Sequence, residues 1–239
     1  MSNDQEIKTV DFDKMDVYLL SGNRKNISRE LLEIYQKSFE CWFDTWNDYF
    51  HGEYQTNIKL ASNEFTRQDD IMALFYEGKC FGVTFFKEVD WDDPTASHDA
   101  YFAPWTPEAI SGLISRGKKV IICSQFTIAK EFRSIKTDIQ WKHILCGFTM
   151  TRFLNSDAAA MTGTMRISKG MHKVAAYGGA VTLVPNLKCD DHEGELVELM
   201  AFYQKEVQAT YENNPYHEKF NSVWSRLNGK LRSQLRLVA

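Results

Sequence analysis

The chain has 239 residues, of which 44% are hydrophobic and 25% are charged, and its formal net charge is −4. This length and composition suit a globular protein, which we expect to form a single domain over residues 1–239. The net negative charge argues against a nucleic-acid partner, and no apolar run approaches the roughly 20 residues of a membrane helix. The polar start MSNDQEIKTVDFDK is unlike a secretory signal, so we expect a cytoplasmic protein without a membrane span.

The first expected element is an amphipathic helix over residues 28–50. Ser28 is a suitable N-cap and Glu30 lies in the first turn, followed by a strongly aromatic apolar face. Trp42 and Trp46 belong to this face. Two interpretations remain open for them, namely simple core packing and the wall of a pocket for an acyl chain.

A β-hairpin is expected over residues 71–91. The run IMALFY is followed by Glu77, Gly78 and Lys79 and then by CFGVTFF, which is typical of two strands joined by a tight turn. Residues 92–107 hold three of the five prolines, which predicts an irregular loop or flexible lid. Loops of this length often serve binding.

The middle of the chain predicts a β-α-β unit. The apolar run VIICSQFTIA, preceded by a short helix at 108–116, has the length of a strand buried on both faces. Residues 138–155 have a helical period, and residues 158–165 are expected to be the second strand. A short helix over 169–177 should stop at the two glycines that follow it.

The remaining elements complete a predicted core of about residues 28–184. A strand is expected at 180–184, a helix at 194–210 and a basic surface helix at 223–236, so residues 194–239 are predicted to form a helical extension. Five cysteines without C-x-x-C spacing argue against disulfides and against a metal site, and we expect most of them to be buried thiols. They are Cys41, Cys80, Cys123, Cys146 and Cys189.

This order of elements resembles the Gcn5-related N-acyltransferase (GNAT) superfamily. Within it, the stretch CSQFTI from Cys123 to Ile128 and the segment MRISKGMHKVAAYGGA are most similar to autoinducer synthases and N-acyl amino acid synthases. The resemblance implies an α/β fold whose mixed central sheet has splayed parallel strands and helices on both faces. It also implies an N-acyltransferase that moves an acyl group from a thioester to a small-molecule amine.

The resemblance further implies where the acyl donor binds. The donor is acyl-CoA or an acyl carrier protein, used as a co-substrate with no permanently bound cofactor, and its arm pairs like an extra strand with the backbone of Phe126, Thr127 and Ile128. Its phosphate lies near the start of the following helix. The family's phosphate loop has glycines that are missing after Arg133 here, so Arg133 and Lys136 either pair with a carrier protein's phosphate or are solvated loop cations.

The expected catalytic residues also depart from the family pattern. Autoinducer synthases have a glutamate and an arginine where this chain has Ile122 and Gln125. Ser124 is then a candidate for holding a water or protonating the leaving thiolate, or else a small strand residue. Tyr177 is a candidate proton donor, although the family tyrosine lies closer to Ala175.

Three further polar residues are candidates on or near the second strand of the β-α-β unit. His172 has a side chain suited to proton transfer. Arg166 and Ser168 flank the strand end, where α/β proteins usually bind ligands, and Arg166 is suited to a carboxylate of the acceptor.

Two alternatives to an N-acyltransferase remain. One is a non-catalytic module of the same fold that binds a small ligand or a protein. The other is an unrelated α/β enzyme, although G-x-S-x-G, P-loop and G-x-G-x-x-G motifs are all missing from the sequence.

Overall fold

The computed structural model describes residues 7–53, 59–188 and 195–235, with side chains up to residue 227. The chain divides into two compact units. The first contains Met1–Phe86, Gln125–Leu145 and Glu218–Ala239, and the second contains Lys87–Ser124 and Cys146–His217. Among the described helices, none is long and apolar enough to cross a membrane.

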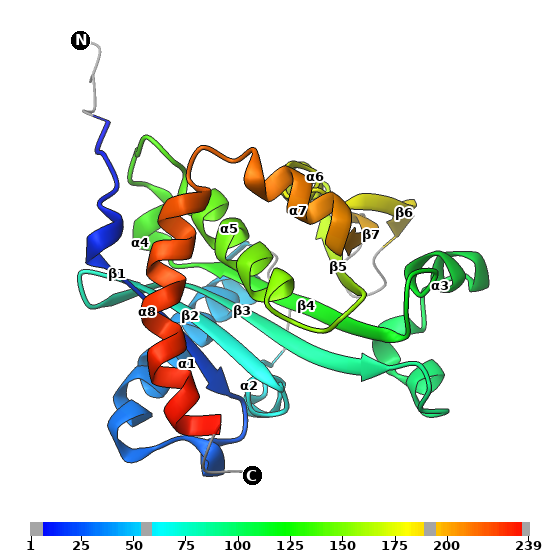
Figure 1. Cartoon of the computed structure of the whole chain (residues 1–239), viewed down its shortest axis with the longest axis horizontal. Coiled ribbons are helices and arrows are strands. Elements are labelled where there is room, and N and C mark those ends of the chain that lie inside the picture. Colours follow the sequence, from blue (N-terminus) through cyan, green and yellow to red (C-terminus); the bar gives the residue numbers. More distant parts are fainter. Residues whose placement is uncertain (1–6, 54–58, 189–194, 236–239) are drawn as a thin grey trace. The chain divides into compact units, whose positions relative to one another are not determined.

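The fold is α/β and is built on a mixed sheet in the strand order β1-β2-β3-β4-β5-β7-β6 (Figure 1). The β4–β5 pair is parallel, and the β1–β2, β2–β3, β5–β7 and β6–β7 pairs are antiparallel. The strands are β1 (Met15–Ser21), β2 (Asp70–Tyr76), β3 (Lys79–Asp90), β4 (Lys119–Ile128), β5 (Ala160–Arg166), β6 (Val181–Lys188) and β7 (Leu196–Tyr203). The helices are α1 (Leu32–Asn47), α2 (Ser62–Thr66), α3 (Pro107–Leu113), α4 (Lys130–Arg133), α5 (Trp141–Leu154), α6 (Met171–Tyr177), α7 (Gln204–Glu212) and α8 (His217–Leu235).

The expected hairpin is confirmed as β2 and β3. Its turn residues, Glu77 and Gly78, have φ angles of 50° and 76°. Two consecutive residues with positive φ match the twist of the flanking strands, which is the geometry of a type I′ turn. Strand β1, which pairs with β2 from Met15↔Tyr76 to Ser21↔Asp70, was not among the expected elements.

The sheet of the first unit is covered on both faces. Ile71, Ala73 and Phe75 of β2 belong to an aromatic cluster with Trp42 of α1. Because side chains alternate along a strand, Met72 and Leu74 face the other way, and they are also buried. Figure 1 shows α8 in front of β1 and β2 and α1 behind them.

The helix expected from residue 28 is confirmed in its central part. A 3-10 turn at Arg29–Leu31 leads into α1, and a π-helical turn, Asp48–Glu53, follows it. Ser28 precedes the 3-10 turn, but its side chain makes no capping hydrogen bond. The helix is held mainly by burial of its aromatic face, since Trp42 is fully buried.

In the second unit, the proline-rich segment is an anchored loop. It contains 3-10 turns at Ala96–His98 and Ala100–Phe102. Phe102 and Trp105 are buried in a cluster with Leu113 of α3 and Val120 of β4. These contacts support the irregular-loop interpretation and fix the segment over one face of the parallel strands.

One predicted element is wrong. The helix expected at 194–210 is a strand over its first part, because β7 occupies Leu196–Tyr203 and a helix, α7, begins only at Gln204. Leucine, methionine, alanine and glutamate favour helices. Pairing of β7 with both β5 and β6 overrides that local preference.

The C-terminal helix also differs from its prediction. It begins at His217, ahead of the expected residue 223. It was expected on the surface, yet Phe220, Val223, Trp224 and Leu227 are buried. This spacing of three and four residues gives one apolar face, which is the reason the helix packs against its unit.

Candidate functional site

The parallel strands β4 and β5 pair over a short stretch. Their register runs from Val120↔Ala160 to Ile122↔Thr162, whereas β4 itself continues to Ile128. Beyond Ile122, the strand contains Gln125 with a φ angle of 54°. Residues other than glycine rarely adopt this left-handed backbone conformation, so the strand has a local kink at Gln125.

Two indoles of α1 hold the kinked part of β4. The Trp42 Nε1–H group donates to Gln125 Oε1 at 3.1 Å, and the Trp46 Nε1–H group donates to Thr127 Oγ1 at 2.9 Å. The Thr127 hydroxyl in turn donates to the Gln125 carbonyl oxygen at 2.7 Å. Thr127 is buried, whereas Gln125, Phe126 and Ile128 are half-buried. The left-handed backbone of Gln125 is therefore fixed by a short hydrogen-bonded chain.

The two cations expected near a donor phosphate lie after β4 in the first unit. Both Arg133 and Lys136 are exposed. Arg133 Nε donates to the carbonyl oxygen of Ile128 at 2.7 Å, so this side chain folds back onto the strand end. Thr45, Asp48, Lys130 and Arg133 also line a cavity of about 420 Å³.

In the second unit, the hydroxyl groups of Tyr101, Thr162 and Thr164 lie near the end of the parallel register. Tyr101, from the anchored loop, has its hydroxyl oxygen 3.5 Å from Thr164 Oγ1 of β5. Burial raises the pKa of Tyr101 to about 12, while hydrogen bonds with Thr164 and Thr162 act in the opposite direction. The phenol therefore stays protonated at neutral pH and remains able to donate a hydrogen bond.

Gly163 brings two strands of this unit close together. A Cβ atom placed on Gly163 would lie 3.1 Å from the carbonyl oxygen of Cys123 and 2.6 Å from the Met165 side chain. Ser124, the next residue of β4, is half-buried. The close approach of β4 and β5 at this point thus requires a residue without a side chain.

The short helix that carries His172 and Tyr177 is confirmed as α6. It ends at Gly178, and Gly179 follows with a φ angle of 91°. A side chain on Gly179 would approach Thr210 Oγ1 to 2.9 Å, so the predicted glycine stop has a steric as well as a conformational reason.

His172 and Tyr177 differ in their surroundings. His172 is half-buried, and its Nδ1 atom is buried without a hydrogen-bond partner among the described residues. A buried polar atom of this kind is costly unless a ligand or water satisfies it. Tyr177 is the last residue of α6 and is 51% exposed. Of these two candidates, His172 has the environment better suited to a bound group.

Arg166 and Ser168 lie at the end of β5, as expected. Arg166 pairs with Val197 in the β5–β7 register. The Ser168 hydroxyl donates to Glu195 Oε1 at 2.6 Å, and Glu195 is 6% exposed. Glu195 was not among the residues expected at the site, although its place just before an apolar run was an available signal.

Solved structures with similar folds include three synthases. AHL synthase LasI superposes with a TM-score of 0.53 at 13% identity, over 82% of this chain and 93% of that one. FeeM, an N-acyl amino acid synthase from uncultured soil microbes, superposes with a TM-score of 0.51 at 9% identity, over 82% of this chain and 95% of that one. The CoA-dependent acyl-homoserine lactone synthase BjaI, solved with SAM and isopentyl-CoA, superposes with a TM-score of 0.53 at 12% identity, over 87% of this chain and 98% of that one.

These likenesses establish the fold. The chain has a divergent GNAT-like fold close to that of the autoinducer synthases, as the sequence resemblance predicted. No protein-family model matches the sequence, and no curated protein matches it significantly.

Proposed function

We propose that the protein is an N-acyltransferase that moves an acyl group from a thioester donor to a small-molecule amine. The observation that carries this proposal is the short β4–β5 register followed by the kinked, tethered end of β4. A strand whose end is held by side chains offers its backbone to an extended ligand, and the pantetheine arm of CoA or of an acyl carrier protein is such a ligand. The fold shared with acyltransferases supports the same reaction class.

In this proposal the donor arm lies along Phe126, Thr127 and Ile128. Phe126 and Ile128 are half-buried, as residues beside a bound arm would be. Arg133, whose Nε atom is bonded to the Ile128 carbonyl, brings a positive charge to the strand end, and Lys136 lies three residues further on. Each cation can pair with a phosphate group, whether that phosphate belongs to CoA or to the arm of an acyl carrier protein.

Proton transfer is assigned separately. His172 is the first candidate because its Nδ1 atom is buried without a partner among the described residues, so a substrate amine or thiolate would satisfy it. Ser124 is the second candidate because its hydroxyl belongs to β4. The exposed Tyr177 is the weakest of the three. Arg166 and Ser168 are assigned to the acceptor.

The assay that tests this function measures release of free thiol. Purified protein is incubated with acyl-CoA and acyl carrier protein thioesters of several chain lengths and with a panel of amines, and the acylated product is identified by mass spectrometry. We expect amine-dependent thiol release with at least one donor class. His172→Asn should reduce the turnover number at least tenfold while leaving donor affinity unchanged.

One observation favours a second candidate, a non-catalytic binding module. Ile122 is 4% exposed and Gln125 is bonded to Trp42, so neither position supplies the carboxylate base that autoinducer synthases have there. A thermal-shift measurement with CoA and with an acyl carrier protein separates the two candidates. Stabilisation by the donor without any thiol release would select the binding module. The absence of both binding and turnover would exclude both candidates.

A further inference from the structure

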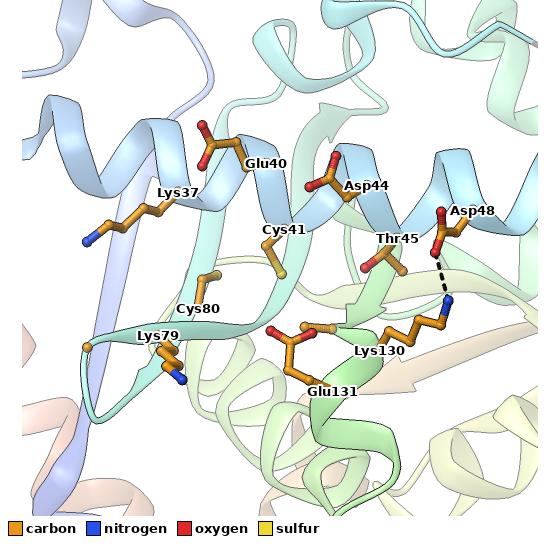
Figure 2. A pocket seen from close by; sticks show the side chains of 12 residues that line it. Lys37, Glu40, Cys41, Asp44, Thr45, Asp48, Lys79, Cys80, Lys130 and Glu131 are labelled. Carbon is orange, nitrogen blue, oxygen red and sulfur yellow. Dashed lines mark hydrogen bonds and ion pairs between the residues drawn. The ribbon is translucent and has the colours of Figure 1, made fainter.

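Two cysteines of the first unit face each other across α1 and β3. Figure 2 shows the side chains of Cys41 on α1 and Cys80 on β3 directed into the space between these elements. Both are free thiols, and the neighbouring Cys41 side chain is the largest cause of the raised pKa of Cys80. Cys80 Sγ also lies 3.8 Å from the Gly82 carbonyl oxygen. Helix α2 and strand β2 lie between the two cysteines in the sequence, and folding brings the pair together.

The two thiols are reachable by a small solute. Both line a groove of about 500 Å³, together with Lys37 and Lys79 (Figure 2). Both are half-buried, whereas Cys123 and Cys146 of the second unit are buried. Cys189 lies outside the described residues. Among the described cysteines, Cys41 and Cys80 therefore combine mutual contact with access from solvent.

The Cys80 thiol holds its proton firmly. The adjacent Cys41 side chain and burial together raise the pKa of Cys80 far above its usual range. Attack on an oxidant requires a thiolate, so the protonated Cys80 is the less suited of the two sulfur atoms to react first.

We propose that Cys41 and Cys80 are a redox-active dithiol that a hydroperoxide converts reversibly into a disulfide. The Cys41 thiolate attacks a peroxide oxygen, the O–O bond breaks, and Cys41 becomes a sulfenic acid while the leaving oxygen takes a proton. The Cys80 sulfur then displaces hydroxide from Cys41, forming the S–S bond and a second water. With hydrogen peroxide, two thiols and one peroxide give one disulfide and two waters. A small-molecule thiol reverses the step by exchange.

The disulfide would fasten α1 to β3 beside the indoles that hold β4. Cys41 directly precedes Trp42, whose Nε1–H group donates to Gln125. Oxidation would therefore restrict the helix that fixes the kink. The proposal concerns the chain itself and holds whether or not the protein transfers acyl groups.

Peptide mapping tests the proposal directly. Each of the five cysteines falls in a different tryptic peptide, with Cys41 in residues 38–59 and Cys80 in residues 80–87. After brief treatment of the folded chain with hydrogen peroxide, we expect these two peptides to be recovered cross-linked. Because one disulfide consumes two of the five thiols, the thiol count of the denatured protein should fall from five to three, and dithiothreitol should restore it.

Matched variants make the result specific. Cys41→Ser and Cys80→Ser should each abolish the cross-link, whereas Cys123→Ala should retain it. Should one serine variant fail to fold, the other variant and the wild-type peptide map still decide the outcome. Recovery of the two peptides unlinked, whether still reduced or separately oxidised, would overturn the proposal, as would a cross-link of either cysteine to another one.

Discussion

The two halves of β4 are held in different ways. From Val120 to Ile122, the strand pairs in parallel with β5, and its three side chains are at most 4% exposed. From Gln125 to Ile128, no pairing with β5 is present among the described residues, and two indoles of α1 bond to Gln125 and Thr127. The first half is therefore held by β5 and by burial, and the second half has additional side-chain bonds from α1.

This difference indicates where stability and function are separated along the strand. Burial and ladder hydrogen bonds stabilise a regular strand whatever its role. A left-handed residue in a strand costs free energy and persists only when its surroundings enforce it. The surroundings here are Trp42 and Trp46, so the aromatic face of α1 combines core packing with a specific polar contact to β4.

The largest expected effect comes from removing Trp42. Trp42→Ala should lower the free energy of unfolding by about 3–5 kcal/mol, because a fully buried indole is replaced by a cavity. Trp42→Phe keeps most of the packing and loses only the hydrogen bond to Gln125, so it should cost about 1–2 kcal/mol. Urea unfolding monitored by circular dichroism measures both. Equal losses for the two variants would mean that the hydrogen bond, and not the packing, is what α1 contributes.

The second prediction concerns Tyr101, which contacts β5, and the dependence of stability on alkaline pH. The pKa of Tyr101 is raised to about 12 from the ordinary tyrosine value of 10.0, so the folded chain keeps this proton between those pH values while the unfolded chain loses it. This contribution is fully present below pH 10 and is lost as the pH rises toward 12. Wild type should therefore lose about 2 kcal/mol more stability than Tyr101→Phe over that window. Parallel stability curves for the two proteins would contradict the burial of the phenol.

Much of the fold was predictable because its signals are local. The Glu77–Gly78 turn, the glycine stop after Tyr177 and the apolar run of β4 each depend on a few neighbouring residues. Strand β7 was not predictable in this way, since its helix-favouring residues become a strand only through pairing with β5 and β6.

The candidate site was predictable only in part. The resemblance identified the stretch of β4 and the short helix with His172, which the structure describes as β4 and α6. It gave no indication of the left-handed Gln125, because a glutamine carries no sequence signal for positive φ. Nor did it bring Tyr101 to Thr164 or Cys41 to Cys80, since these contacts join residues that are distant in the sequence.

A pair of substitutions at Gln125 should test the kink itself. Gln125→Val and Gln125→Gly both remove the acceptor of the Trp42 indole, so their difference isolates the backbone. Because valine is strained at a φ of 54° and glycine is not, the valine variant should be less stable by about 1–2 kcal/mol. At Ile121, in the regular half of the strand, the order should be reversed, with glycine the more destabilising. The same order at both positions would show that the two halves do not differ.

The smallest expected effect on stability, and the one most informative about function, is at Arg133. Arg133→Ala should change the free energy of unfolding by less than about 0.5 kcal/mol, because the side chain is exposed. If Arg133 binds the donor phosphate, the KM for the thioester should rise about tenfold, as expected for loss of a charge-assisted contact of about 1.4 kcal/mol. Arg67→Ala, at another exposed arginine of the first unit, serves as the matched control and should leave KM unchanged. A lowered kcat with an unaltered KM would instead place Arg133 in the chemical step, and no kinetic change would leave it as a cation that only caps the end of β4.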